Sequence, residues 1–222
     1  MITGSCYLLE TPHTKLLVDC GMFQGSRFTE SLNYDPFLFD PKSIDAVLLT
    51  HAHIDHSGRL PKLCREGFRG AIWATSPTID FAHELLLDSE HIIRGEAEHE
   101  GVEPFYTLKD VEHVFTHTKA VAYGEVTKLS EDVSFRLYEA GHILGSAIVE
   151  VFVTHADRTT KIVFSGDLGN TPVPLLRDLH KEKEAEYVVM ESTYGDKLHE
   201  AQGARKDTLE DVIEDTVAAG GT

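Results

Sequence analysis

Residues 44–56 have the sequence I-D-A-V-L-L-T-H-A-H-I-D-H, in which an apolar run leads directly into a cluster of histidines and an aspartate. A continuous apolar run of this kind is typical of a strand buried on both faces of a sheet. Proteins built from alternating strands and helices place their sites beyond the carboxyl ends of such strands. Randomly scattered histidines and aspartates would produce the H-x-H-x-D-H pattern with a probability of about 0.003. We therefore expect a functional site directly after this strand.

The side chains of this motif indicate metal binding. Imidazole and carboxylate groups together suit zinc, iron or manganese, and the lack of adjacent thiolates argues against a closed structural zinc site. His51 and His53 are two residues apart on extended backbone, so both can bind one ion, whereas Asp55 and His56 face a second ion. The alternative interpretation is a solvated, histidine-rich turn.

Three further segments contain residue types that bind metals. His142 lies between glycines in A-G-H-I-L-G-S, where glycine permits a tight turn of the backbone. Asp167 ends the run I-V-F-S-G-D, and Asp19 ends the run L-L-V-D. Alone, His142 would more often be an ordinary core or surface histidine, and Asp167 a turn residue. Together with the H-x-H-x-D-H motif they form a candidate ligand set.

The rest of the chain is organised as strands and helices in two successive groups. We expect a hairpin from residues 6–10 and 15–19, followed later by a long helix that Ser76 and Pro77 open and that ends near Arg94. The other expected elements are helices at 60–65, 107–115 and 207–219 and strands at 44–50, 71–74, 126–129, 133–138, 147–153, 161–164 and 187–190. Helices that cover sheets in this order indicate an α/β or α+β fold.

The composition is that of an ordinary globular protein. Hydrophobic residues make up 41% and charged residues 26% of the 222 residues, which excludes the disordered, collagen-like and coiled-coil classes. No apolar run approaches the roughly 20 residues of a membrane helix, and the first ten residues lack the pattern of a secretory signal. We therefore expect a cytoplasmic protein with no membrane partner, in which Cys6, Cys20 and Cys64 are small buried thiols.

The charge distribution argues against a nucleic-acid surface. The chain has 20 Lys and Arg against 37 Asp and Glu, a formal net charge of −17. Most of the acidic residues lie after residue 75. Nucleic acids bind through Lys and Arg, so any assignment to a nucleic-acid substrate has to explain this excess of acid.

Taken together, Asp19, H-A-H-I-D-H, A-G-H-I-L-G-S and S-G-D-L-G-N resemble, in order and spacing, the motifs of the metallo-β-lactamase fold. The segment E-S-T-Y-G at 191–195 is similar to the acidic motif that opens the β-CASP region of RNA- and DNA-processing nucleases. This resemblance implies an α/β (α+β) fold of the four-layer αββα type. It also implies a site with two Zn2+ ions, with the following residues: His51, His53 and His142 on the first zinc, Asp55 and His56 on the second, and Asp167 bridging both.

The resemblance also implies roles for three carboxylates. Asp19 would orient the histidines of the motif. Asp55 would accept a hydrogen bond from the attacking hydroxide, and Glu191 would act catalytically with a histidine from later in the chain. By this resemblance, residues 1–195 form the metallo-β-lactamase domain and residues 196–222 begin the β-CASP domain. We expect a fragment that lacks the family's first strand, its returning strands and one ligand of the second zinc, so that water fills this place and the activity of the fragment alone is left open.

The implied function is that of a zinc-dependent phosphodiester hydrolase acting on RNA, by attack of a hydroxide on phosphorus at a two-metal site. Single-stranded DNA is a second candidate substrate, and a homodimer is compatible with the pattern. Two zinc ions would add four positive charges at the site and would there offset the negative potential of the acidic chain. Two alternatives are a hydrolase of a small ester, thioester or lactone on the same fold, and a non-catalytic scaffold paralogue. Intact ligands at all six positions argue against the scaffold.

Overall fold

The computed structural model describes residues 3–170, 175–181, 183–197 and 204–221. The chain divides into two compact units, Met1–Glu191 and Ser192–Thr222. The second unit contains helix α6 (Ala204–Ala218), which is followed by Gly220 in the left-handed conformation. This helix agrees with the expectation of a helix at 207–219, apart from its start. That residues 196–222 begin a second domain stays a prediction.

The first unit contains two five-stranded sheets. The first, sheet A, has the order β1-β2-β3-β4-β5. Its strands are β1 (Tyr7–Glu10), β2 (Lys15–Val18), β3 (Ala46–Leu48), β4 (Ala71–Ala74) and β5 (Thr118–Ala120). The hairpin β1-β2 is antiparallel and the other neighbours are parallel. The expected hairpin and buried central strand are therefore confirmed, whereas β5, a short edge strand of sequence T-K-A, was not expected because it has no apolar run.

The second sheet, sheet B, has the order β10-β9-β8-β7-β6. Its strands are β6 (Thr127–Lys128), β7 (Val133–Glu139), β8 (Ala147–His155), β9 (Arg158–Phe164) and β10 (Tyr187–Val189). The pairs β6-β7, β7-β8 and β8-β9 are antiparallel, and β9-β10 is parallel. All five strands overlap strands expected from the sequence.

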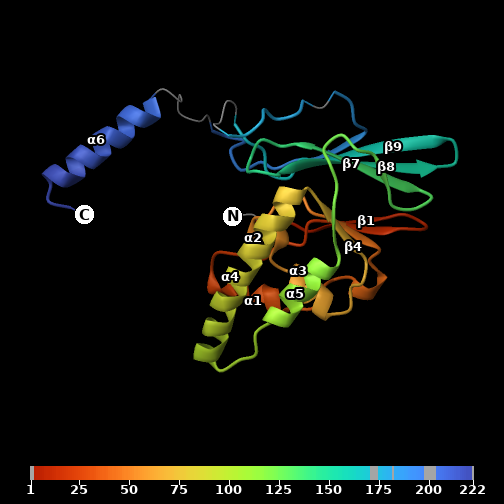
Figure 1. Cartoon of the computed structure of the whole chain (residues 1–222), viewed down its shortest axis with the longest axis horizontal. Coiled ribbons are helices and arrows are strands. Elements are labelled where there is room, and N and C mark those ends of the chain that lie inside the picture. The colour runs from red at the N-terminus through yellow and green to blue at the C-terminus, as the bar shows by residue number, and fades with distance from the viewer. Residues whose placement is uncertain (1–2, 171–174, 182, 198–203, 222) are drawn as a thin grey trace. The chain divides into compact units, whose positions relative to one another are not determined.

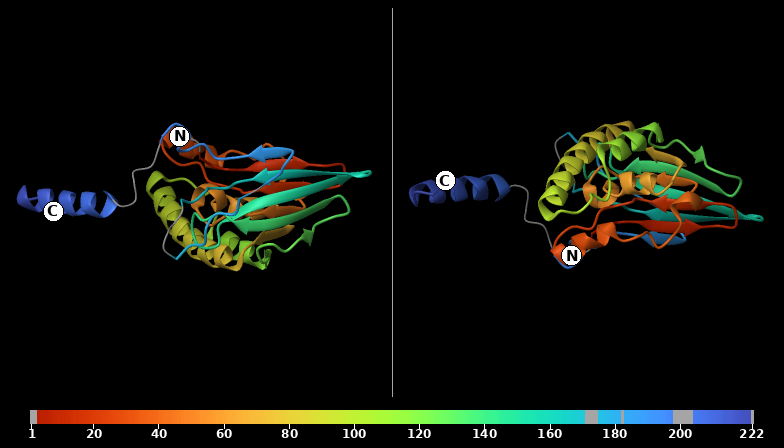
Figure 2. Two further views of the ribbon diagram at one scale, coloured as in Figure 1. Left: turned by 90° about the horizontal axis from the view of Figure 1, so that it is seen from above. Right: turned by 90° about the horizontal axis from the view of Figure 1, so that it is seen from below.

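The helices of the first unit cover the outer face of sheet A (Figures 1 and 2). They are α1 (Arg27–Ser31), α2 (Ile54–Ser57), α3 (Leu60–Arg65), α4 (Ser76–Glu100) and α5 (Leu108–Thr116), with 3-10 turns at Leu32–Tyr34 and Pro41–Ser43. Helix α4 begins at Ser76, but its N-cap is Thr75, whose side chain accepts a hydrogen bond from Thr78 N–H, so Ser76 is not the cap that its residue type indicated. The helix runs past the expected end near Arg94 because Ala97 continues its buried stripe, and the left-handed Gly101 terminates it. No helix among the described residues is both long and apolar enough to cross a membrane.

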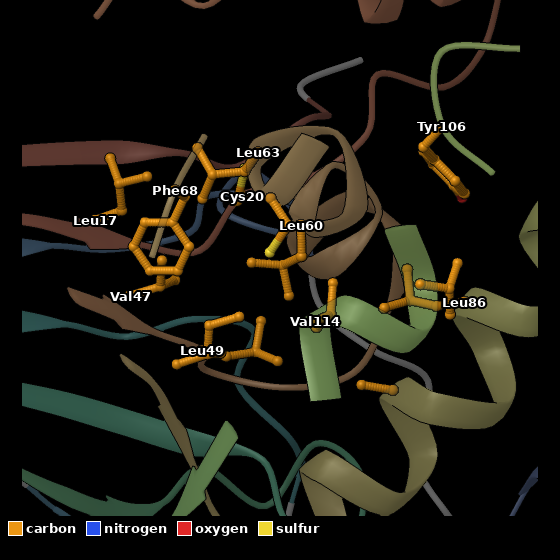
Figure 3. Packing of buried hydrophobic residues seen from close by; sticks show 14 of the residues in the cluster. Leu17, Cys20, Val47, Leu49, Leu60, Leu63, Phe68, Leu86, Tyr106 and Val114 are labelled. Carbon is orange, nitrogen blue, oxygen red and sulfur yellow. The ribbon is translucent and has the colours of Figure 1, made fainter. Parts of the chain in front are cut away.

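Alternate residues of the central strands face two separate cores. Leu17, Val47 and Leu49 pack toward the helices, in the cluster that Figure 3 shows from close by. Their neighbours Leu16 and Leu48 pack between the two sheets, with residues of β7 and β8. Burial on both faces explains the continuous apolar run of β3. The expected αββα type of fold is thus confirmed, and the described residues of the first unit form three of its layers, the helices, sheet A and sheet B, in agreement with the expectation that the sandwich is incomplete.

The cysteines agree in part with the expectation of buried thiols. Cys20 and Cys64 are fully buried in the core on the helix side of sheet A, and Cys6 is half-buried beside it. All three are free thiols.

Candidate metal centre

The H-x-H-x-D-H motif spans the end of β3 and the start of α2. Leu49 N–H still donates to Trp73 O of the neighbouring strand at 2.9 Å, which extends the sheet pairing one residue past β3. His51 is fully buried directly beyond this point. His53 is the residue before α2, so Asp55 and His56 lie within this short helix and not after a simple turn. The change from strand to helix turns the side chains of one short motif toward a common pocket.

Four of the expected ligands, His51, His53, His142 and Asp167, lie close together and form the first of two groups. His53 Nδ1 lies 3.1 Å from His51 Nε2 and 3.2 Å from His142 Nε2. Asp167 Oδ2 lies 3.7 Å from His51 Nε2 and 3.6 Å from His142 Nε2. One potential ligand atom from each of the four residues lies within 4.8 Å of the other three, a spacing that could hold one metal ion.

Of the two remaining expected ligands, His56 lies beside the other oxygen of Asp167, and Asp55 lies beside His56. His56 Nε2 is 3.2 Å from Asp167 Oδ1 and 3.9 Å from Asp55 Oδ2. Asp167 therefore directs one carboxylate oxygen toward each group. The structure brings all six sequence-predicted ligands into one cluster of contacting side chains, in two adjoining groups that meet at this aspartate.

Asp19 lies behind this pocket and is almost fully buried. Its Oδ2 accepts a hydrogen bond from His56 Nδ1 at 2.7 Å, and its Oδ1 accepts one from Thr50 N–H at 2.8 Å. The backbone of Asp19 is left-handed, with φ of 61°, a conformation that aspartate tolerates better than most residues. This conformation comes directly after β2 and places the carboxylate beneath the motif. The expected contact of Asp19 with a motif histidine is therefore present.

The loop that carries His142 is anchored to the start of α4. Gly145 O accepts hydrogen bonds from Thr75 Oγ1 at 2.7 Å and from Thr78 Oγ1 at 2.8 Å. Within the loop, Ser146 Oγ accepts one from His142 N–H at 3.1 Å. Gly145 has φ of 87°, and a Cβ at this position would lie 2.7 Å from Thr78 N. A glycine is thus required here by both conformation and space, in agreement with the turn expected from the sequence.

The turn that carries Asp167 is anchored by Glu191. Glu191 Oε1 accepts a hydrogen bond from Leu168 N–H at 2.6 Å, and Glu191 N–H donates to Ser165 Oγ at 3.1 Å. Gly166, with φ of 55°, lies against Thr50, since a Cβ there would be 2.8 Å from Thr50 Cβ. Glu191 therefore bonds residues on both sides of Asp167, the backbone of Leu168 and the side chain of Ser165. Its catalytic role stays a prediction.

The surroundings shift the pKa values of His51 and His56 in opposite directions. Burial and the neighbouring His56 lower the pKa of His51 to about 2, so its imidazole is neutral at neutral pH. Burial also acts to lower the pKa of His56, but its hydrogen bonds with Asp167 and Asp19 outweigh this and raise the pKa to about 10. The hydrogen bond from His56 lowers the pKa of Asp167 to about 2. The carboxylates thus stabilise positive charge at this point of the pocket.

The donor set fits a metal of the zinc type. Three imidazole nitrogens with a carboxylate oxygen are ligands that zinc accepts at a site open to water, and no cysteine is among them. Asp167 and His142 are both only half-buried, so the pocket is reachable from solvent. His51 and Asp19, in contrast, are buried and hydrogen-bonded, which fixes the inner wall of the site.

Sequence reasoning missed the residues that hold the ligands in place. Thr50, Ser146, Thr75 and Thr78 were not singled out, although each makes a hydrogen bond described above. Thr50 directly precedes the motif, but nothing in its residue type marks it. Thr75 and Thr78 lie about 70 residues before the loop that they anchor. Only the folded chain brings them to it.

An acidic groove of about 1010 Å³ lies next to α2. It runs between residues 22–34 and the C-terminal half of α4, and Ile54 forms part of its lining. Its acidic lining residues are Glu30, Asp88, Glu96 and Glu100. One basic lining residue, Arg27, pairs with Glu100 at 3.4 Å. This groove therefore does not provide a basic surface for a polyanion.

Comparisons with known proteins agree with the geometry. The family model described as the metallo-beta-lactamase superfamily matches residues 2–215. Ribonuclease TTHA0252 of Thermus thermophilus is 40% identical over 220 residues, which make up 99% of this chain and 48% of that protein. Transcription termination factor FttA of Methanosarcina mazei is 36% identical over 226 residues, covering 98% of this chain and 34% of that protein. The chain spans about half the length of the first relative and about a third of the second.

Among solved structures, the chain is similar to the subclass B3 metallo-beta-lactamase MEM-A1 from a soil metagenome library. It is 21% identical, with a TM-score of 0.44, over 78% of this chain and 65% of that chain.

Proposed function

Because the chain belongs to the metallo-β-lactamase superfamily, we propose that it carries the metal site of a zinc-dependent ribonuclease of the β-CASP type. The observation that carries this proposal is the shared position of Asp167 between two groups of ligands. Asp167 Oδ2 faces His51 and His142, and Asp167 Oδ1 faces His56. The similarity to a ribonuclease and to a transcription termination factor supports RNA as the substrate class.

The proposed ligands follow the two groups in the pocket. His51, His53 and His142 would hold one zinc ion, and Asp55 and His56 the other, with Asp167 shared. A zinc pair of this kind, when bound, supplies Lewis-acid activation of a water and of the phosphodiester. We propose that water completes the second ion's coordination in this chain. The residues that we assign to holding this arrangement are Asp19, behind His56, and Glu191, behind the Asp167 turn.

Asp55 and Glu191 are the proposed catalytic carboxylates. Asp55 is half-buried and directs Oδ2 toward His56 Nε2, so it could accept a hydrogen bond from a water at the second group. Glu191 Oε1 accepts a hydrogen bond from Leu168 N–H, and we propose that its other oxygen acts with a proton-carrying partner. We propose that this partner is a histidine that is not among the described residues near Glu191.

An RNA substrate has to approach a strongly acidic chain. The net charge is −17, and the groove beside α2 is lined by carboxylates. Four positive charges from two zinc ions would offset this locally, because a phosphodiester responds to the potential at the site more than to net charge. We therefore propose that RNA is bound at the metal pocket and not along this groove. Single-stranded DNA would satisfy the same requirement.

The experiment that tests this function is cleavage of a labelled single-stranded RNA by the purified protein, with and without EDTA and with zinc added back. Asp167→Asn is the matched variant, because it keeps the shape of the side chain and removes the shared charge. We expect cleavage that depends on zinc and that falls at least a hundredfold in Asp167→Asn.

Absence of RNA cleavage by a protein that binds zinc would contradict the assignment. A panel of thioesters and lactones, assayed in parallel, would then identify a small-molecule hydrolase on the same ligand set. A folded protein that binds no zinc at all would favour the non-catalytic scaffold.

A further inference from the structure

Thr50 lies between the segments that carry the expected ligands, and its side chain is almost fully buried. Its Oγ1 is 2.9 Å from Asp19 Oδ2 and 3.0 Å from His51 Nδ1. The same Oγ1 is 3.4 Å from His56 Nδ1, which bonds Asp19 directly at 2.7 Å. One hydroxyl thus contacts the buried carboxylate and a histidine from each group of ligands.

The number of protons in this cluster determines the direction of each bond. A threonine hydroxyl has one hydrogen to donate, and an ionised carboxylate can only accept. Thr50 Oγ1 therefore donates to Asp19, and it can only accept from His51. For this, His51 must carry its proton on Nδ1, which leaves the lone pair of Nε2 free. His51 Nε2 is the atom that faces His53 and Asp167 in the pocket.

His56 is oriented in the same way by the same carboxylate. Its Nδ1 donates to Asp19 Oδ2, and its Nε2 faces Asp167 Oδ1. Asp19 therefore orients one histidine from each group, His56 directly and His51 through the hydroxyl of Thr50. The hydroxyl of Thr50 is thus within hydrogen-bond distance of both the carboxylate and His51.

The backbone of Thr50 joins the same segments. Its N–H donates to Asp19 Oδ1 at 2.8 Å, and its carbonyl accepts from Ala147 N–H, at the start of β8, at 2.8 Å. Its side chain also packs against Gly166, one residue before Asp167. Thr50 thus connects the end of sheet A to the two parts of sheet B that carry His142 and Asp167.

We propose that Thr50 is a positioning residue that fixes the Nδ1–H tautomer of His51 and thereby links the two groups of ligands through Asp19. The proposal rests on the proposed function only in assuming that the pocket binds metal. Hydrogen-bond partners behind metal ligands typically contribute about 10- to 100-fold to metal affinity. We expect an effect of this size from the loss of the hydroxyl.

The test compares Thr50→Val, which keeps the shape and removes the hydroxyl, with Thr50→Ser, which keeps the hydroxyl. Thr14→Val is a matched control, because Thr14 is also buried and also donates to a carboxylate, that of Asp132, outside the pocket. Titration with Co2+ as a spectroscopic substitute for zinc measures affinity and the geometry of coordination. We expect Thr50→Val to weaken binding about 10- to 100-fold and to change the Co2+ absorption spectrum. Thr50→Ser and Thr14→Val should both bind as the wild type does.

A second measurement needs no variant. Long-range 1H–15N NMR spectra of the metal-free protein report which ring nitrogen of His51 carries the proton, and we expect Nδ1. A proton on Nε2, or wild-type Co2+ binding and spectrum in a folded Thr50→Val, would overturn the proposal. If the wild type binds metal but cleaves no RNA, the proposed function fails while the role of Thr50 stands. If the wild type binds no metal, the proposed site fails, and the NMR result alone tests Thr50.

Discussion

Substitution of Gly145 by alanine tests whether the contact between α4 and the loop holds His142 in place. Gly145 has φ of 87°, and an alanine in this region costs about 1–2 kcal/mol. The new Cβ would lie 2.7 Å from Thr78 N and 2.8 Å from Thr75 Oγ1, so the loop has to move away from α4. This movement would break the two hydrogen bonds to Gly145 O, each worth about 1 kcal/mol net. We therefore expect Gly145→Ala to lower the free energy of unfolding by about 3–4 kcal/mol in total.

Gly101→Ala is the matched control for this substitution. Gly101 also has a positive φ, of 70°, but nothing lies within 4 Å of a Cβ built at this position. It should therefore cost only the conformational part, about 1–2 kcal/mol. Urea unfolding of both variants measures the difference, and zinc titration measures the displacement of His142. We expect weaker zinc binding in Gly145→Ala alone.

Equal losses of stability in the two variants, with unchanged zinc affinity, would refute this reasoning. The hydroxyls of Thr75 and Thr78 would then contribute nothing to the position of the loop. A large loss of stability with normal zinc affinity would mean that α4 and the loop separate without moving His142.

Two further predictions concern Asp132 and Glu191. Burial acts to raise the pKa of Asp132, but hydrogen bonds, chiefly from Thr11 and Ser130, lower it from 3.8 to about 2. The ionised Asp132 carboxylate therefore stabilises the folded state fully above pH 4, and this contribution is lost as the pH falls through 2. Asp132→Asn should flatten the fall in unfolding free energy between pH 5 and pH 2.5 in urea titrations, and an unchanged slope would contradict this. Glu191→Gln keeps an oxygen for Leu168 N–H, so we expect it to retain zinc binding and to lose RNA cleavage, whereas Glu191→Ala should lose both. Cleavage by Glu191→Gln at the wild-type rate would show that the charge is not catalytic.

Much of the fold follows from local patterns in the sequence. The apolar run before His51 predicts a buried central strand because a strand with both faces covered has no position for a polar residue. The N-terminal hairpin and the start of the long helix follow from similar short-range signals. The short edge strand β5 and the last turns of α4 could not be predicted in this way, since they depend on a neighbouring strand and on the small buried Ala97.

The types of ligand could also be predicted from the sequence, because histidine and aspartate in H-x-H-x-D-H are unusual and chemically specific. The arrangement of the ligands in space could not be predicted. The position of Asp167 between the two groups depends on the hydrogen bond between Leu168 and Glu191, which are 23 residues apart in the chain. The tautomer of His51 depends on the hydrogen bond between Thr50 and Asp19, which are 31 residues apart. Hydrogen bonds between residues so far apart in the chain exist only when sheet A, sheet B and α4 are packed together. Residue chemistry is therefore local, whereas the direction of each lone pair is a property of the assembled fold.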